Sequence, residues 1–146
     1  MTQSIVLNMY RDLMLSITRG SYCGHVINAK PIYLLSIFSL IENDVVKDNH
    51  LYYNEELNDE YGRMFKELTS DKQTPLFKPF VFMGSEPFYH LKWRSLQDRL
   101  PHDSNGKFVR ENIEYAYLDN ALWDLLQEKE TRDYLKETII NFYLKQ

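Results

Sequence analysis

Apolar residues recur at helical spacing in the first half of the chain. Residues 3–20 carry an apolar stripe and end at Gly20, which is typical of a helix stop. Residues 30–44 are apolar around most of a helical circumference, so this helix is predicted to lie at the centre of the domain, with Asn28 as its cap. A third helix is predicted to begin after Asn54, its cap. Its apolar stripe consists of Leu57, Tyr61, Met64, Phe65 and Leu68.

The second half combines extended segments with two closing helices. Residues 79–83 and 88–93 are predicted to pair as an antiparallel hairpin around residues 84–85. Residues 108–118 are predicted to be extended, and Asp119 is predicted to cap the helix that follows. The last helix places four residues on one face: Leu135, Ile139, Phe142 and Tyr143.

These elements predict one α+β domain over residues 1–146. It is mainly helical, with about five helices and a small antiparallel sheet. Loops are predicted at residues 21–29, 69–75 and 101–107, the last with an Asn-Gly turn. A helix, a turn with a short strand, a further helix and an aromatic hairpin also follow one another in winged-helix DNA-binding proteins. Fold order alone does not fix function, so this order is weak evidence for DNA binding.

The composition indicates in which cell compartment the protein is expected and which kinds of binding partner are expected. No run approaches the roughly 18 apolar residues of a membrane span, and the N-terminal residues lack a signal-peptide pattern. The single cysteine favours a reducing cytoplasm. The net charge of −4 argues against non-specific binding to nucleic acid. Residues 78–110 differ, because six Lys and Arg stand there against three acidic residues, which suits either an anion-binding face or a solvated charge mixture.

Candidate catalytic and metal sites are weakly indicated. Cys23 lies two residues before His25, but a cysteine nucleophile also needs a base within reach and a group that orients it. The four histidines stand singly, without the paired spacing of zinc ligands. The five glycines form no phosphate-binding loop. The sequence therefore favours a protein that is not an enzyme and needs no metal or other cofactor.

Residues 78–93, KPFVFMGSEPFYHLKW, combine two Pro-Phe steps with cations at their ends. The three phenylalanines and Tyr89 can all be core residues, and at least two of them are expected to be. Core packing does not require the flanking cations, however, and Pro79 has no N–H, which leaves apolar surface open to contact. Basic side chains beside exposed aromatic or proline surface are typical of contacts with a nucleic-acid backbone.

Three segments together resemble the sulfur-binding domain that precedes the HNH nuclease in phosphorothioate-dependent type IV restriction endonucleases. They are NAKPIYLLSIFSLIENDVVKDNHL, FKPFVFMGSEPFYHLKW and ENIEYAYLDNALWDLLQEKETRDYLKETIINFYL. The resemblance covers nearly everything from Asn28 onward. Each motif alone is moderately specific, and the three in this order are more so. Two positions depart from the family pattern: Ala29 stands where members commonly carry histidine, and Lys78 where they often carry tyrosine.

The resemblance implies recognition of double-stranded DNA in which sulfur replaces a non-bridging phosphate oxygen. Pro79 and Phe80 would form an apolar cup, with Phe82 as its far wall. The aliphatic stem of Lys78 would replace the family's ring, and Lys30 would face phosphate. The charge count adds six candidates for a basic rim around the cup: His90, Lys92, Arg94, Arg99, Lys107 and Arg110.

The function expected from these features is a non-catalytic DNA-binding module of a bacterial restriction system, located in the cytoplasm and without membrane contact. No HNH pattern follows the closing helix, so cleavage is expected to come from a nuclease domain or subunit elsewhere. Two alternatives remain open. The chain can be a protein–protein adaptor that retains the fold, or the targeting part of a split HNH nuclease.

Overall fold

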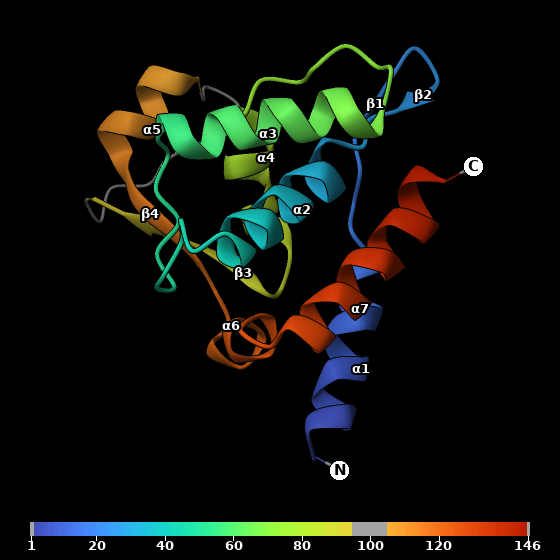
Figure 1. Cartoon of the computed structure of the whole chain (residues 1–146). Coiled ribbons are helices and arrows are strands. Elements are labelled where there is room, and N and C mark those ends of the chain that lie inside the picture. The colour runs from blue at the N-terminus through green and yellow to red at the C-terminus, as the bar shows by residue number, and fades with distance from the viewer. Residues whose placement is uncertain (1, 95–104, 146) are drawn as a thin grey trace.

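Helix α2 (Ala29–Glu42) lies at the centre of the computed structural model, which describes residues 2–94 and 105–145 (Figure 1). Its side chains are buried on every side of the helix, as its apolar circumference predicts. The other elements, in chain order, are α1 (Thr2–Met14), β1 (Ser21–Tyr22), β2 (His25–Val26), α3 (Glu55–Leu68), α4 (Phe77–Phe82), β3 (Tyr89–Trp93), α5 (Gly106–Asn112), β4 (Ile113–Leu118), α6 (Asn120–Leu126) and α7 (Lys129–Ile139). Helices α3, α4 and α7 pack against α2.

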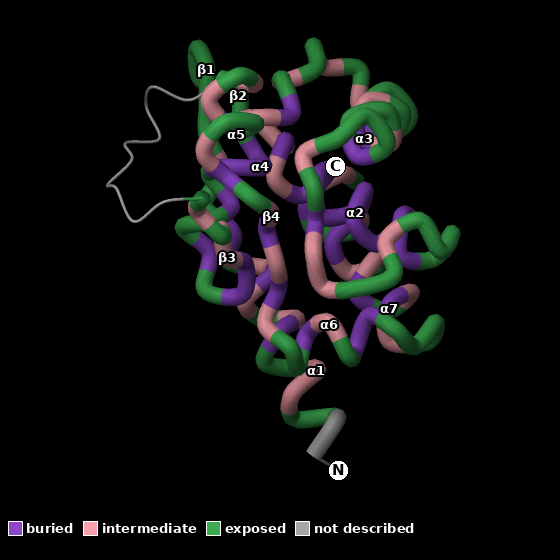
Figure 2. Tube along the Cα trace, turned by 90° about the vertical axis from the view of Figure 1, so that its left-hand side faces the viewer, coloured by how far each residue is buried: buried purple, intermediate pink, exposed green. Residues whose placement is uncertain are grey.

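The architecture is α+β and mainly helical, which confirms the predicted fold class. Figure 2 shows buried stretches on α2 and also on α4, β3 and β4. Within the described residues the strands form two antiparallel pairs, β1 with β2 and β3 with β4. A 3₁₀ turn at Met83–Ser85 follows α4, and a π-helical turn at Ile140–Leu144 extends α7. No helix in the described ranges is long and apolar enough to cross a bilayer.

The predicted hairpin of residues 79–83 with 88–93 is wrong. Residues 79–82 belong to α4, which accepts Pro79 because a proline in the first turn removes no intrahelical hydrogen bond. Strand β3 pairs instead with β4, which lies much later in the chain, starting with Tyr89 opposite Leu118. Alternating side chains identify a strand but not its partner, so tertiary packing decides this pairing.

Two further segments differ from the sequence prediction. Residues 108–118 are extended only in their second part, because α5 occupies the first. The predicted Asn-Gly turn starts this helix, and the Asn105 Oδ1 accepts the Phe108 N–H at 2.8 Å. In the predicted loop over residues 21–29, β1 and β2 form a hairpin. Its two turn residues, Cys23 and Gly24, have φ values of 52° and 79°, as a tight two-residue turn requires.

The predicted helix caps have two kinds of outcome. Asn54 caps α3, because its Oδ1 accepts the N–H of the third helical residue at 2.9 Å. Asn28 stands at the start of α2, but its side chain accepts a hydrogen bond from Arg19 instead. Asp119 stands at the start of α6, where its carboxylate accepts the Tyr10 hydroxyl hydrogen instead of a backbone N–H. Tertiary partners therefore replace the local cap at two of the three helices.

The first and last helices also differ in detail. Helix α1 ends at Met14, before the predicted stop at Gly20. In the closing helix Leu135 and Ile139 are buried as predicted, and so is Tyr143. Phe142 is 52% exposed, because the π-helical turn shifts it off the apolar face.

Candidate functional site

A pocket of about 880 Å³ opens between the N-terminal end of α2, α4 and the β1–β2 hairpin. The loop over residues 71–75 closes it on the side of α3. We term it the α2–α4 pocket. Its apolar wall includes the side chains of Tyr22, Ala29, Pro79 and Phe82. Figure 1 shows the hairpin and the start of α2 close together in space, which explains how separate segments line one pocket.

Four of the residues predicted from sequence lie together in this pocket. They are Lys30, from the first turn of α2, and Lys78, Pro79 and Phe82, from α4. Phe82 is 41% exposed and Lys78 is exposed, so both are accessible from solvent. The packing of α4 against α2 brings the two segments together although they are far apart in sequence. The pocket therefore combines apolar surface with two of the predicted cations.

Phe80 is a correction to the predicted cup. Its side chain is fully buried, and its ring packs edge-on against Tyr33 and Tyr53, with centroids 6.2 and 5.3 Å away. The Tyr89 hydroxyl donates to the Phe80 carbonyl at 2.7 Å and lies 2.8 Å from the Tyr33 hydroxyl, so the Tyr33 hydroxyl donates to it. Burial raises the pKa of Tyr33 and of Tyr89. Phe80 thus anchors α4 to the core and contributes no surface to the pocket.

Lys30 forms a buried ion pair below the pocket. Its Nζ lies 2.9 Å from the Glu86 Oε2 and also donates to the Ser85 hydroxyl at 3.3 Å. The side chains are 13% exposed for Lys30 and 5% for Glu86. The same carboxylate accepts the Thr18 N–H at 3.2 Å, which ties the segment before the hairpin to the end of α4. Removing one partner of a buried pair typically costs about 3–5 kcal/mol, because the other charge is left uncompensated.

Two further cations, which the sequence interpretation did not identify, also line the pocket. Arg19 donates to the Asn28 Oδ1 at 2.8 Å, and its guanidinium lies 4.8 Å from the centroid of the Tyr143 ring. The Asn28 amide and the Tyr143 ring are both neutral, so neither of them compensates the positive charge of Arg19. Lys72 is exposed and makes no ion pair with a described residue. Both cations come from loops, which carry no periodic signal that would place them beside α4.

The Asp71 carboxylate is also engaged by the hairpin. Its Oδ2 lies 3.0 Å from the His25 Nε2, and this hydrogen bond lowers the pKa of Asp71. The contact joins the hairpin to the loop of residues 71–75, and both residues line the pocket. Lys30 compensates Glu86, and the three remaining cations of the lining, Arg19, Lys72 and Lys78, outnumber Asp71, so the pocket favours anions.

The predicted basic rim does not line this pocket. Lys92 and Arg94 are exposed on and after β3, whereas Lys107 and Arg110 are exposed on α5. The side chain of His90 is 38% exposed, and its Nε2 lies 2.6 Å from the Asp119 Oδ1. Arg99 lies outside the described residues. The five described members of the predicted rim therefore lie on or directly after β3 and on α5, and not among the residues that line the α2–α4 pocket.

His90 belongs to a structural network instead. Asp119 also accepts the Tyr10 hydroxyl hydrogen at 2.8 Å, so one carboxylate connects α1, β3 and the start of α6. Burial and the hydrogen bond to Asp119 raise the pKa of Tyr10 to about 12. In the described residues no group of three His, Cys, Asp or Glu side chains comes together as a metal would require.

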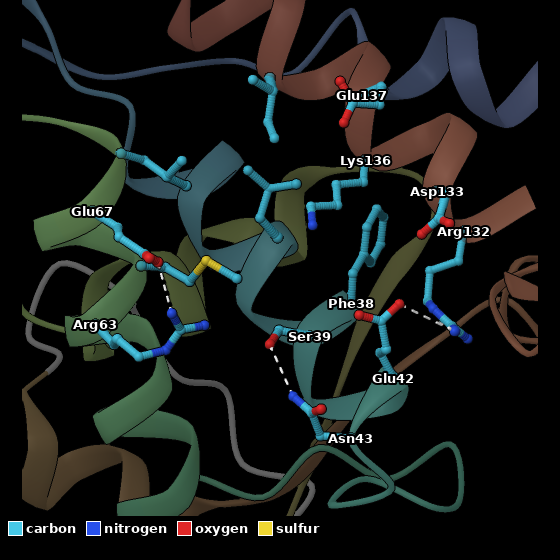
Figure 3. Close-up of a pocket in the computed structure, with 14 residues that line it drawn as sticks. Phe38, Ser39, Glu42, Asn43, Arg63, Glu67, Arg132, Asp133, Lys136 and Glu137 are labelled. Carbon is cyan, nitrogen blue, oxygen red and sulfur yellow. Dashed lines mark hydrogen bonds and ion pairs between the residues drawn. The ribbon is translucent and has the colours of Figure 1, made fainter.

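A second pocket, of about 610 Å³, lies between α2, α3 and α7 (Figure 3). Its charged side chains mostly bind one another. Arg63 contacts Glu67 at 2.6 Å, and Arg132 lies 3.5 Å from Glu42 and donates to the Leu126 carbonyl. The Nε of Arg132 is buried without a hydrogen-bond partner among the described residues. Cations and carboxylates alternate around this pocket, so it shows no net preference for an anion.

The α2–α4 pocket is thus the place where the sequence motif and an accessible, cationic and apolar surface coincide. The resemblance to the sulfur-binding domain rests on the three sequence segments alone. No model of a known protein family matches the chain, and a search of curated proteins gives no match either.

Proposed function

We propose that this chain is a non-catalytic DNA-binding module that recognises phosphorothioate-modified double-stranded DNA through the α2–α4 pocket. The observation that carries the proposal is the meeting of the exposed Phe82 with Lys30 and Lys78 in one solvent-open pocket, which the buried Pro79 also lines. These are positions that the resemblance to the sulfur-binding domain implies as the apolar cup and its cations. Arg19 and Lys72 add positive charge beside them.

The chemistry of the pocket suits a sulfur atom within a polyanion. Sulfur is larger and softer than oxygen and accepts hydrogen bonds poorly, so it loses less free energy when an apolar wall removes its water. The neighbouring phosphates keep their full charge and are held by the cations. A small apolar contact of this kind discriminates by about 1–3 kcal/mol, or roughly 5- to 150-fold in affinity.

The proposal is tested by fluorescence anisotropy with two duplexes that differ in a single non-bridging atom. The protein should bind the phosphorothioate duplex at least about fivefold more tightly than the phosphate duplex. Sulfur also makes the phosphorus stereogenic, so a fixed pocket should prefer one of the two diastereomers. Equal affinity for all duplexes would reject recognition of sulfur.

Two variants separate the apolar contact from the charge. Phe82→Ala should reduce the ratio between the two duplexes, because it removes an accessible wall of the pocket. Lys78→Gln should weaken both duplexes alike and make binding less dependent on salt. Phe142→Ala is the matched control, because Phe142 is similarly exposed and does not line the pocket. A ratio that falls equally in the Phe82 and Phe142 variants would contradict the assignment.

The biological setting follows from the same proposal. A module that marks modified DNA without cutting it belongs with a nuclease domain or subunit that is supplied elsewhere, as in a bacterial restriction system. Such a module acts where the DNA is, in the cytoplasm. Cleavage of modified DNA should therefore require an added nuclease partner, and the chain alone should leave the duplex intact.

A further inference from the structure

The outward side of the β3–β4 sheet carries a connected set of aromatic rings that the pocket does not use. Segment 50–52 joins β4 through a backbone bridge at its middle residue and acts as a third short strand. Residues that alternate with the buried positions of these strands point outward. We term five of them the aromatic face: His50, Tyr52, His90, Tyr115 and Tyr117.

The rings contact one another in an unbroken series. The His90 and Tyr117 centroids are 5.1 Å apart, and Tyr117 lies 6.0 Å from Tyr115. Tyr115 is 4.0 Å from His50, with ring planes tilted by 31°, and 6.0 Å from Tyr52. Stacked and edge contacts therefore extend across all three strands.

The face is open to solvent. Tyr52 is 49% exposed, and the side chains of His50 and His90 are 42% and 38% exposed. Tyr115 and Tyr117 are half-buried by their neighbours on the face. Cross-strand aromatic pairs stabilise a sheet by about 0.2–1 kcal/mol each. Stability of the sheet alone, however, does not require five rings together on its solvent-exposed side. Contiguous exposed apolar surface of this kind marks interaction sites.

Two exposed cations lie beside the face. Lys92 stands directly opposite Tyr115 in the strand register, and Arg94 follows it. Both are exposed, and neither forms an ion pair with a residue that the structure describes. Two carboxylates contact the histidines of the face: Asp119 lies 2.6 Å from the His90 Nε2 and accepts the Tyr10 hydroxyl hydrogen, and the Asp48 carboxylate lies 3.9 Å from the His50 Nδ1. Glu114 is exposed beside the strand bulge. Lys92 and Arg94 nevertheless give the face a cationic edge of the kind that follows a nucleic-acid backbone.

We propose that the aromatic face binds unpaired nucleobases of a single-stranded nucleic acid, with Lys92 and Arg94 contacting its phosphates. Every base presents a flat face that stacks on tyrosine or histidine, and a cationic edge follows the backbone. An intact duplex hides these base faces in its own stack. None of the five rings lines the α2–α4 pocket, so this inference stands or falls separately from recognition of phosphorothioate.

The test is an anisotropy titration with single-stranded oligo-dT, oligo-U, an abasic oligonucleotide of the same length and the corresponding duplex. The oligonucleotides with bases should bind more tightly than the abasic one, which keeps every phosphate charge. Tyr52→Ala should weaken binding by about fivefold or more, and Tyr52→Trp should retain it. Tyr52 is half exposed, so both variants should fold, and circular dichroism checks this. Lys92→Gln should lower the salt slope by about 0.7.

Phe142→Ala supplies the control for loss of an exposed aromatic ring away from the face and should bind like the unaltered chain. Equal binding of the abasic strand, or an unchanged affinity in the folded Tyr52→Ala variant, would overturn the inference. Binding of a neutral polysaccharide with no binding of either oligonucleotide would also overturn it. If only the Tyr52 result fails while Phe82→Ala still lowers the preference for phosphorothioate duplex, the proposed function survives alone.

Discussion

Glu86 controls how much positive charge the α2–α4 pocket presents. Its buried carboxylate accepts hydrogen bonds from the Lys30 ammonium at 2.9 Å and from the Thr18 N–H at 3.2 Å. The substitution Glu86→Gln keeps an oxygen acceptor of nearly the same shape and removes the negative charge. The Lys30 ammonium is then no longer neutralised, although it still lines the pocket. We therefore expect this variant to bind DNA more tightly than the unaltered chain.

The magnitude follows from counterion release. One additional neutralised phosphate steepens the slope of log K against log salt by about 0.9, which corresponds to roughly eightfold tighter binding at about 0.1 M salt. The fold should become less stable, because a hydrogen bond between a charged donor and a neutral oxygen is weaker than a buried ion pair. A loss of about 3–5 kcal/mol in the free energy of unfolding is expected, because the charge of Lys30 is left uncompensated.

The assay is a series of duplex titrations at several salt concentrations, with urea unfolding of the same samples. Glu67→Gln is the matched control, since it removes one carboxylate from α3, outside the pocket, and changes the net charge equally. Arg63 keeps its contact with Glu60 at 2.6 Å in that variant, so no cation is released. If the folded Glu86→Gln protein has the unaltered slope and affinity, Lys30 does not face DNA and the reasoning fails.

Three further predictions concern the fold. Asn54→Ala should lower the free energy of unfolding by about 1 kcal/mol in urea, whereas Asn58→Ala on the exposed side of the same helix should have little effect; equal losses would contradict the cap. Phe80→Ala should cost about 3–5 kcal/mol in thermal unfolding, and Phe82→Ala less than about 1 kcal/mol, so a reversed order would refute their placement. The pKa of Tyr10 is raised to about 12, so its contribution to stability should be complete below about pH 10 and lost as pH rises through 12. Absorbance of ionised tyrosine should show a late phase that Tyr10→Phe diminishes, and an unchanged late phase would count against this contribution.

The central helix could be predicted because its signal is local. A segment that is apolar around its whole circumference has to lie in the core, whatever surrounds it, and α2 does. The Asn54 cap was predictable for the same reason, because donor and acceptor lie three residues apart. Asn28 and Asp119 show the limit of such arguments, since a partner far along the chain satisfies each side chain instead.

The error at Phe80 has a geometric cause. In a strand, Phe80 and Phe82 lie on one face, because side chains repeat every two residues. In a helix the same two residues point roughly 200° apart. Since the segment is α4, Phe80 is buried in the core and Phe82 faces the pocket. The resemblance implied that both rings belong to the cup, and the strand periodicity predicted for the segment was consistent with that, whereas the helix separates them.

The cations of the candidate site could be predicted only in part. Lys30 and Lys78 were identified through the family motif, and the packing of α2 against α4 brings them together. Arg19 and Lys72 come from loops whose positions depend on contacts with Tyr143 and on the chain between α3 and α4. The sequence alone therefore does not show that Arg19 and Lys72 lie close to Lys30 and Lys78.

Strand β3 separates the two proposed sites, because its alternate side chains serve opposite faces. Tyr89 points inward, and its hydroxyl binds the Phe80 carbonyl and the Tyr33 hydroxyl, which fixes α4 against α2. Phe82 keeps its place in the pocket because Phe80 is held in this way. The next residue, His90, points outward and begins the aromatic face. Changes confined to the outward side therefore leave the support of the pocket intact, which is why the two proposals can be tested on one chain without confusing their outcomes.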